Sequence, residues 1–264
     1  MKKLVLALTA FAAVTGSASA ADLAARPYTK APAPVAYAPS WTGCYIAGGG
    51  GGAMTKNDHH DVDTLGVVSG VPGAVISPNL STGADGWFGT VGAGCDYQFN
   101  NFVVGIFGDY DFMDVKGDVS TFGFFGPAAT GSQKMDSQWA VGGRVGYLVM
   151  PQLLTYVSGG YTQAHWKSTT LFDFFTPGVP VGSLNGATKG GWFIGAGDEY
   201  ALSFLPGLFW KTEYRYSEFD RTDATFNLTG FGAFSTVSER FKEHSVRSEL
   251  VYRFNWAGPV VAKY

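Results

Sequence analysis

The stretch WKTEYRYSEF at residues 210–219 alternates between two kinds of side chain. Every second position is charged: Lys211, Glu213 and Arg215. The positions between them hold mostly aromatic rings: Trp210, Tyr214 and Tyr216. A period of two is typical of a β-strand whose two faces meet different surroundings. A soluble sheet would expose the charges and bury the rings, whereas a membrane barrel would turn the rings to lipid and enclose the charges.

The first part of the chain predicts export. Residues 1–20 combine Lys2 and Lys3, the short apolar run LVLALTAFAAV and the small-residue sequence ASA, which together are typical of a secretory signal peptide. Residues 21–40 are rich in Pro and Ala, and we interpret them as an extended periplasmic linker. Residues 41–254 are predicted to form one β-barrel domain, followed by a C-terminal tail at 255–264.

The composition supports a membrane barrel. The chain has 37 Gly in 264 residues, with 16% aromatic and only 15% charged residues, as barrels with aromatic girdles do. Beyond the signal peptide, no run of apolar residues is long enough for a spanning helix. The net charge of -3 and the absence of a basic tract argue against nucleic acid as a partner.

Eight strands are predicted from the alternation of apolar and polar residues. They lie near 41–53, 86–99, 102–114, 136–149, 153–166, 191–203, 208–221 and 241–254. Three connections are short: NN at 100–101, MPQ at 150–152 and LPG at 205–207. The other connections, at 54–85, 115–135, 167–190 and 222–240, are long and polar. Short turns at one end and long loops at the other predict an all-β fold, an eight-stranded antiparallel transmembrane β-barrel with periplasmic turns and extracellular loops.

Charged side chains recur on one face of these strands. That face carries Asp109, Asp111, Arg144, Glu199, Lys211, Glu213, Arg215, Arg247, Glu249 and Arg253. We interpret them as a lumen charge network, because charges that would be costly alone can compensate one another when paired. The opposite faces carry Trp and Tyr near the strand ends, as membrane interfaces prefer. A soluble barrel would need an aromatic interior too bulky for about eight strands to enclose.

Four motifs, in order, resemble one family: WTGCYIAGG, WAVGGRVGYLV, GWFIGAGDEYAL and VRSELVYRFNW. This family comprises the small outer-membrane β-barrel proteins of alphaproteobacteria, including Brucella and rhizobial surface proteins. They are often labelled porin-family and are similar to the OmpA transmembrane barrel. The resemblance covers residues 41–254 and implies an abundant envelope protein; some members are linked to haem-compound binding or host contact. It also implies that Phe254 resembles the assembly signal of the barrel-insertion machinery.

The sequence departs from that family at Cys44, where Phe is usual, and at Asp198, where an aliphatic residue is usual. Asp198 falls on the apolar face, so it lies near a membrane interface or a bulge turns it inward. Cys44 and Cys95 take roughly opposite positions in a predicted hairpin. A cross-strand disulfide and two separate lipid-facing thiols both fit these positions.

No catalytic, metal or cofactor site is predicted. The run GGGGG at 48–52 lacks the Lys-Ser/Thr of a phosphate loop. The loop NDHHDVD at 57–63 places His59 beside His60, but adjacent histidines on an extended chain point apart and a solvated loop fits better. His165 and His244 lie near strand ends with hydroxyl and acidic neighbours, Ser168, Ser245 and Glu243, but no motif joins them into a triad.

Three functions follow as hypotheses. The first is a structural and surface-interaction protein of the envelope, whose lumen is closed by ion pairs. The second is a small-solute channel. The third is binding of a haem-like ligand or a host surface through the Phe-rich loops TFGFFGPAATG, LFDFFTPGVPVG and LTGFGAF, because exposed apolar patches often mark interaction sites. The predicted partners are outer-membrane lipid, the barrel-insertion machinery during assembly and, through the loops, a host or an extracellular ligand.

Overall fold

The computed structural model describes residues 39–66, 69–121, 129–230 and 232–254. These residues form twelve strands: β1 (Gly43–Asp63), β2 (Ala74–Val75), β3 (Leu80–Phe99), β4 (Phe102–Thr121), β5 (Ala129–Met150), β6 (Leu153–Trp166), β7 (Thr169–Asp173), β8 (Pro180–Leu184), β9 (Ala187–Ala201), β10 (Leu208–Phe219), β11 (Thr222–Leu228) and β12 (Gly232–Phe254). No helix within these ranges is long and apolar enough to cross a membrane. The predicted signal peptide, the linker up to residue 38 and the tail at 255–264 lie outside the described residues.

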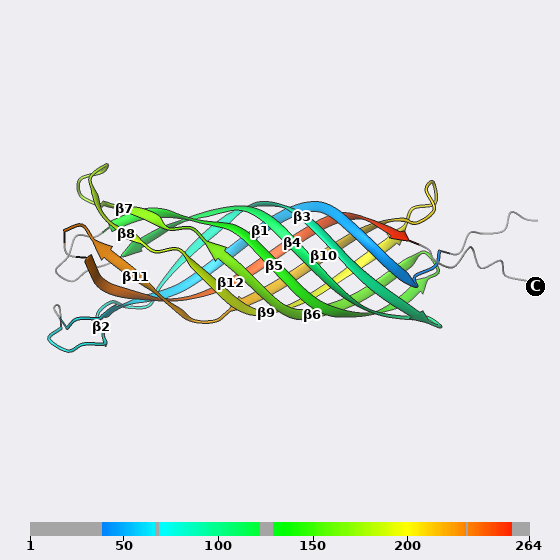
Figure 1. Ribbon diagram of the computed structural model, residues 1–264, viewed down its shortest axis with the longest axis horizontal. Helices are drawn as coiled ribbons and strands as arrows, with labels where there is room; N and C mark the ends of the chain where they lie inside the picture. Colours follow the sequence, from blue (N-terminus) through cyan, green and yellow to red (C-terminus); the bar gives the residue numbers. More distant parts are fainter. Residues whose placement is uncertain (1–38, 67–68, 122–128, 231, 255–264) are drawn as a thin grey trace, which may run out of the picture. The chain divides into compact units, whose positions relative to one another are not determined.

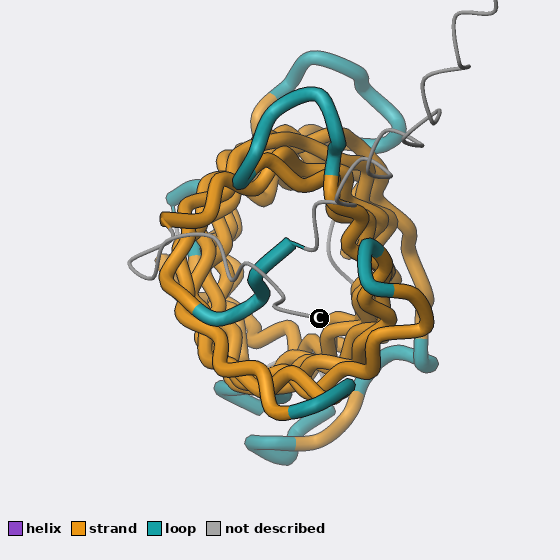
Figure 2. The backbone as a smooth tube through the Cα atoms, turned by 90° about the vertical axis from the view of Figure 1, so that its right-hand side faces the viewer, coloured by secondary structure: helices purple, strands orange, loops and turns teal. Residues whose placement is uncertain are grey.

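Eight strands close a ring in the order β1-β3-β4-β5-β6-β9-β10-β12, and β12 pairs back onto β1. Each neighbouring pair is antiparallel. Figure 2 shows the ring viewed along its axis, and Figure 1 shows that the strands are tilted relative to that axis. The predicted eight-stranded antiparallel barrel is confirmed. A closed ring pairs the strand edges with one another, which a sheet in lipid requires because the hydrocarbon offers no hydrogen-bond partners.

Three short turns join strands at one end of the barrel. Residues 100–101 link β3 to β4, residues 151–152 link β5 to β6, and residues 202–207 link β9 to β10. Asn100 and Gly207 adopt positive φ angles of 53° and 87°, which Asn and Gly accept more readily than other residues. The connections at the opposite end are longer. Because short turns face the periplasm in this class of barrel, we call the two ends inner and outer.

The strands continue well beyond the ends predicted from the sequence. β1 extends to Asp63 and β12 begins at Gly232. Two-residue breaks separate β7 from the preceding β6, β8 from the following β9 and β11 from the preceding β10. These three strands continue the sheet in the order β5-β7-β8-β11-β12. The four long segments predicted as loops are therefore largely strand. The prediction of loops was wrong because the outward face of a strand in water carries polar side chains, so its sequence resembles that of a loop.

The length of the strands places the outer half of the barrel beyond the membrane. At 21 residues and a tilt near 45°, β1 spans about 50 Å along the barrel axis. The apolar band of an outer-membrane barrel is only about 25 Å tall. The outer half must therefore project into the surroundings as a continued barrel.

The outward side chains mark the membrane band. Exposed aromatic residues form an inner girdle of Tyr97, Phe99, Phe102, Tyr147, Tyr200, Tyr252 and Phe254. An outer girdle consists of Trp87, Phe112, Trp139, Tyr161, Trp192, Tyr214 and Tyr216. Asp198 also faces outward, near the inner end of β9, where Thr155 donates a 2.6 Å hydrogen bond to it. The register around it is regular, so no bulge turns it inward, and its place near the interface limits its cost.

Candidate functional site

The inner end of the lumen is filled by Trp41. Its side chain is fully buried, and the residue lies two positions before the start of β1. The indole Nε1 donates to the carbonyl of Pro151 at 3.1 Å, and the ring packs against Phe209 at 4.8 Å. The carbonyl of Trp41 accepts a hydrogen bond from Arg253 at 3.1 Å. The chain thus folds into the lumen before it enters the barrel wall.

The inner ion-pair cluster consists of Asp96, Arg144, Glu199 and Arg253. Arg253 binds Asp96 and Glu199, each at 2.6 Å. Arg144 binds the same two carboxylates, with Nε 3.0 Å from Asp96 and Nη1 2.9 Å from Glu199. All four side chains are at most 2% exposed. Two guanidinium groups and two carboxylates therefore form a compensated square from β3, β5, β9 and β12.

The middle ion-pair cluster lies closer to the outer end of the barrel and has more members. Arg215 binds both oxygens of Asp109, at 3.0 and 2.9 Å, and its Nε donates to Glu213 at 2.9 Å. Arg247 binds Asp111 at 2.9 Å and approaches Asp109 at 3.3 Å. Lys211 and Glu249 form a further pair. Tyr156 donates to Glu213 at 2.8 Å and also lies under Arg144, so it links the middle cluster to the inner one.

Aromatic rings also lie against the guanidinium groups of the middle cluster. Arg215 lies 4.3 Å from the ring of Phe193, and Arg247 lies 5.3 Å from that of Phe88. Cation–π contacts of this kind gain strength when water is excluded. Together with the bidentate pairs, they stabilise charges that burial alone would make costly.

An outer pair, Lys189 and Glu239, was missed by the sequence analysis. The two groups lie 2.6 Å apart and are fully buried, and Lys189 also lies 4.2 Å from the ring of Phe241. Lys189 was placed in a predicted loop, although it shares the inward face of β9 with Phe193 and Glu199. Extending the period-two pattern by one step would have found it. Asp96 is not part of the predicted charge network, although it binds Arg144 and Arg253 in the inner cluster.

Every residue of the predicted charge network lies inside the barrel, at most 8% exposed. Three apolar layers pack around the ion pairs. The inner layer is built around Tyr45, Leu154 and Val251. The middle layer contains Phe88, Met135 and Trp166. The outer layer contains Leu171, Leu184 and Val237.

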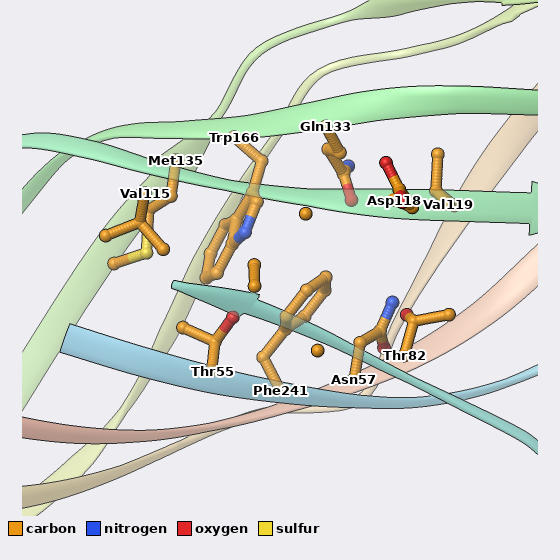
Figure 3. Close-up of a pocket in the computed structure, with 13 residues that line it drawn as sticks. Thr55, Asn57, Thr82, Val115, Asp118, Val119, Gln133, Met135, Trp166 and Phe241 are labelled. Carbon is orange, nitrogen blue, oxygen red and sulfur yellow. The ribbon is translucent and has the colours of Figure 1, made fainter. Parts of the chain in front are cut away.

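A small cavity remains in the outer half of the lumen. Figure 3 shows Trp166 and Phe241 projecting toward one another from different strands, with Asn57 and Gln133 beside them. Its volume is about 20 Å³, which is room for about one water molecule. Such a space cannot hold a solute larger than water.

The two cysteines form a disulfide. Cys44 on β1 lies directly opposite Cys95 on β3, and their Sγ atoms are bonded. Both residues face outward at the inner end of the barrel. Phe254 ends β12 in the inner girdle, with its ring 5.3 Å from that of Tyr252. Its role in assembly stays a prediction.

The histidines of the described residues lie in different surroundings. His59 faces the lumen and His60 faces away from it. His244 faces outward, with Nδ1 2.6 Å from the hydroxyl of Tyr214, whereas Glu243 and Ser245 face the lumen. His165 pairs with Asp136 at 2.6 Å. Among the residues that the structure describes, no group of three or more His, Cys, Asp or Glu side chains is placed to hold a metal ion.

Charged side chains surround the barrel just beyond the outer girdle. This outer collar consists of Lys56, Asp58, Asp85, Asp114, Lys116, Lys134, Asp136, His165, Lys167, Glu218, Arg240 and Lys242. Ion pairs join most of its members. Hydrogen bonds from Lys134 and Lys116 lower the pKa of Asp114, which lies outside the membrane band. The collar thus lies at the level of the lipid headgroups.

Comparison with known proteins agrees with this geometry. A family model described as the outer membrane protein beta-barrel domain matches residues 6–254. The chain belongs to this family. It is 29% identical over 255 residues to the 31 kDa outer-membrane immunogenic proteins of Brucella melitensis and Brucella suis, covering 96% of this chain and 100% of each relative. The protein is therefore an outer-membrane β-barrel protein, as the sequence predicted.

A solved structure supports the fold. The barrel is similar to the outer membrane protein OprG from Pseudomonas aeruginosa, with a TM-score of 0.51 and 14% sequence identity. The match covers 83% of this chain and 100% of that one. At this identity, the similarity concerns the fold alone.

Proposed function

We propose that this outer-membrane protein is a closed barrel with a structural and surface-interaction role in the envelope, and that its lumen does not conduct solutes. The pairing of the lumen charges carries this proposal. Arg144, Arg215, Arg247 and Arg253 each contact two carboxylates. An ion that crossed the lumen would have to separate such pairs, and breaking one buried pair costs about 3–5 kcal/mol.

The alternative of a small-solute channel requires these pairs to rearrange. The test is single-channel recording on the refolded mature protein in a planar bilayer, with folding checked by the heat-modifiable gel shift. We expect no reproducible current steps. The variants Glu213→Ala and Arg215→Ala should introduce a leak, because each leaves a partner charge uncompensated. Stable steps from the wild-type protein that change in these variants would contradict the closed lumen.

A second candidate function is the binding of an extracellular partner at the outer end. A groove of about 710 Å³ lies beside β4, β5 and the β7–β8 connection, lined by Phe172, Phe174 and Pro177 among others. Phe174 and Phe175 are 60% and 80% exposed, and exposed apolar patches of this kind often mark interaction sites. Phe122, Phe124, Phe125 and Phe231 of the predicted Phe-rich loops lie outside the described residues.

The second candidate can be tested on intact cells that display the protein. The double variant Phe174→Ser/Phe175→Ser should reduce adhesion to cultured animal cells several-fold. The matched control Leu65→Ser/Val71→Ser removes two apolar side chains that are also about 60% exposed, but from a different connection. Equal adhesion of both variants and the wild type would remove this candidate.

A further inference from the structure

A groove on the outward surface of the barrel connects the membrane band with the outer collar. It holds about 540 Å³, and its lining residues lie on β10, β12, β1 and β3. Its lining includes Gly52, Met54, Trp87, Tyr214, His244, Val246 and Asp85. Most of these belong to the outer girdle or the apolar band, and Asp85 belongs to the collar. The groove is apolar along its floor and polar at its outer end, which matches the acyl chain and the headgroup of one lipid molecule.

Two lysines lie just beyond the lining of this groove, toward the outer end of the barrel. Lys56 and Lys242 are directly opposite each other on β1 and β12. They lie two residues closer to the outer end of the barrel than the opposed pair Met54 and His244. Like charges directly opposite each other destabilise a sheet. Asp58 lies between them, 3.3 Å from Lys56 but 4.0 Å from Lys242. Glu218 lies directly opposite Lys242 on β10 but pairs with Arg240 at 3.5 Å. Lys242 therefore keeps the capacity to bind a further anion.

A second pair of opposed lysines shows what a satisfied arrangement looks like. Lys116 and Lys134 face each other across β4 and β5. Asp114 lies 3.0 Å from Lys116 and 2.6 Å from Lys134. Asp114 thus binds both lysines closely, whereas Asp58 is close to Lys56 but 4.0 Å from Lys242. The pair Lys116 and Lys134 therefore serves as a matched control for variants of Lys56 and Lys242.

We propose that this groove binds one phosphorylated glycolipid of the outer leaflet. The acyl chain lies along the apolar floor, and Lys56 and Lys242 bind the phosphate by charge-assisted hydrogen bonds. Asp85 on the opposite rim holds, together with the lipid phosphate, the divalent cation that accompanies such headgroups, since Mg²⁺ is commonly bound by one carboxylate and phosphate oxygens. The two ammonium groups and the carboxylate at the rim are complementary to a phosphate and its cation.

The binding test uses native mass spectrometry of the folded barrel in detergent, with bisphosphorylated lipid A as the probe and Mg²⁺ present. Lys56→Gln/Lys242→Gln should weaken binding about tenfold or more. Lys116→Gln/Lys134→Gln removes the same charge and should change binding less than twofold. An equal loss in both variants would mean unspecific attraction to the collar and would overturn the proposal. If the first double variant does not fold, the single variant Lys242→Gln should still lower affinity about threefold.

Two further variants separate the acyl and cation contributions. Gly52→Leu fills the groove without strain, since a Cβ there has only Gly86 O at 3.7 Å, and it should weaken binding at least threefold. Gly143→Leu is the control, with a similarly open outward position on β5. Asp85→Asn should abolish the gain in affinity that Mg²⁺ gives the wild type. Unchanged binding in Gly52→Leu, or full displacement by millimolar inorganic phosphate, would reject a lipid site.

Discussion

The inner and outer halves of the barrel share the same strands, but the character of their outward surface is reversed. In the inner half of β12, Leu250 and Tyr252 face outward while Arg253 faces the lumen. Farther out on the same strand, Lys242 faces outward and Val237 is fully buried. The solvent around each half accounts for the difference: lipid requires an apolar exterior, and water permits a charged one. The point of reversal marks the outer boundary of the membrane.

The largest effect is expected from a buried arginine in the inner half. Arg253→Met leaves Asp96 and Glu199 short of one partner each, and should lower the free energy of unfolding by about 3–5 kcal/mol. Urea titration of the protein in lipid vesicles measures this. The control Arg240→Met makes the same replacement in the outer collar, where the pair with Glu218 is exposed at 3.5 Å, and should change stability by less than about 1 kcal/mol. Similar losses at both sites would contradict the contrast between lumen and collar.

The outer half should fail locally when its apolar layer is damaged. Leu184→Ala on β8 removes a fully buried side chain that packs with Leu171 and Val237, and should cost about 2–4 kcal/mol. Hydrogen exchange should accelerate in β7, β8 and β11, while the inner half of the barrel stays protected. The exposed neighbour Val179→Ala is the control. Faster exchange throughout the barrel would show that the two halves unfold as one unit.

The disulfide should stabilise the barrel without affecting the outer strands β7, β8 and β11. It joins residues 51 positions apart, and removing a link across a loop of that size costs about 2–4 kcal/mol through the unfolded chain. Cys44→Ala/Cys95→Ala should therefore lower the urea midpoint in vesicles. Exchange in β7, β8 and β11 should not change. A variant as stable as the wild type would show that the β1–β3 pairing alone holds this region.

The fold of the inner half was predictable because its pattern is strong. Between the two girdles, charge and aromatic side chains alternate strictly, as at Lys211, Glu213 and Arg215, and tight turns fix where strands end. The outer half was not predictable in the same way. Lys189 and Glu239 lie on strands that face water, where polar outward residues weaken the alternation, so the sequence indicated loops.

The candidate site was predictable in its members but not in its pairing. Period two places Arg253 and Glu199 on the lumen face, but it cannot say which residues meet across the barrel. That Arg253 reaches Asp96 and Glu199 depends on the stagger of strands far apart in the sequence. Trp41 was missed for another reason: its aromatic side chain fits a strand start as well as it fits the interior of the barrel.

The smallest expected effect concerns the pair Asp136 and His165 in the outer collar, outside the membrane band. Burial raises the pKa of Asp136, but the hydrogen bond and charge from His165 outweigh it, so the pKa lies below its ordinary value. A carboxylate with a lowered pKa stabilises the fold above its unfolded pKa and loses that contribution as the pH falls through the folded one. The stability difference between the wild type and Asp136→Asn should therefore shrink as the pH falls below about pH 4.

Urea titrations at several pH values measure this difference, which should stay below about 1 kcal/mol because the pair is exposed to water. High salt should reduce it further, since exposed charges are screened. The effect of Arg253→Met should hardly respond to salt, because its partners are buried in the lumen. If the Asp136 effect instead proved large and insensitive to salt, the collar would lie in a water-poor environment, and the membrane boundary would have to be placed farther out along the strands.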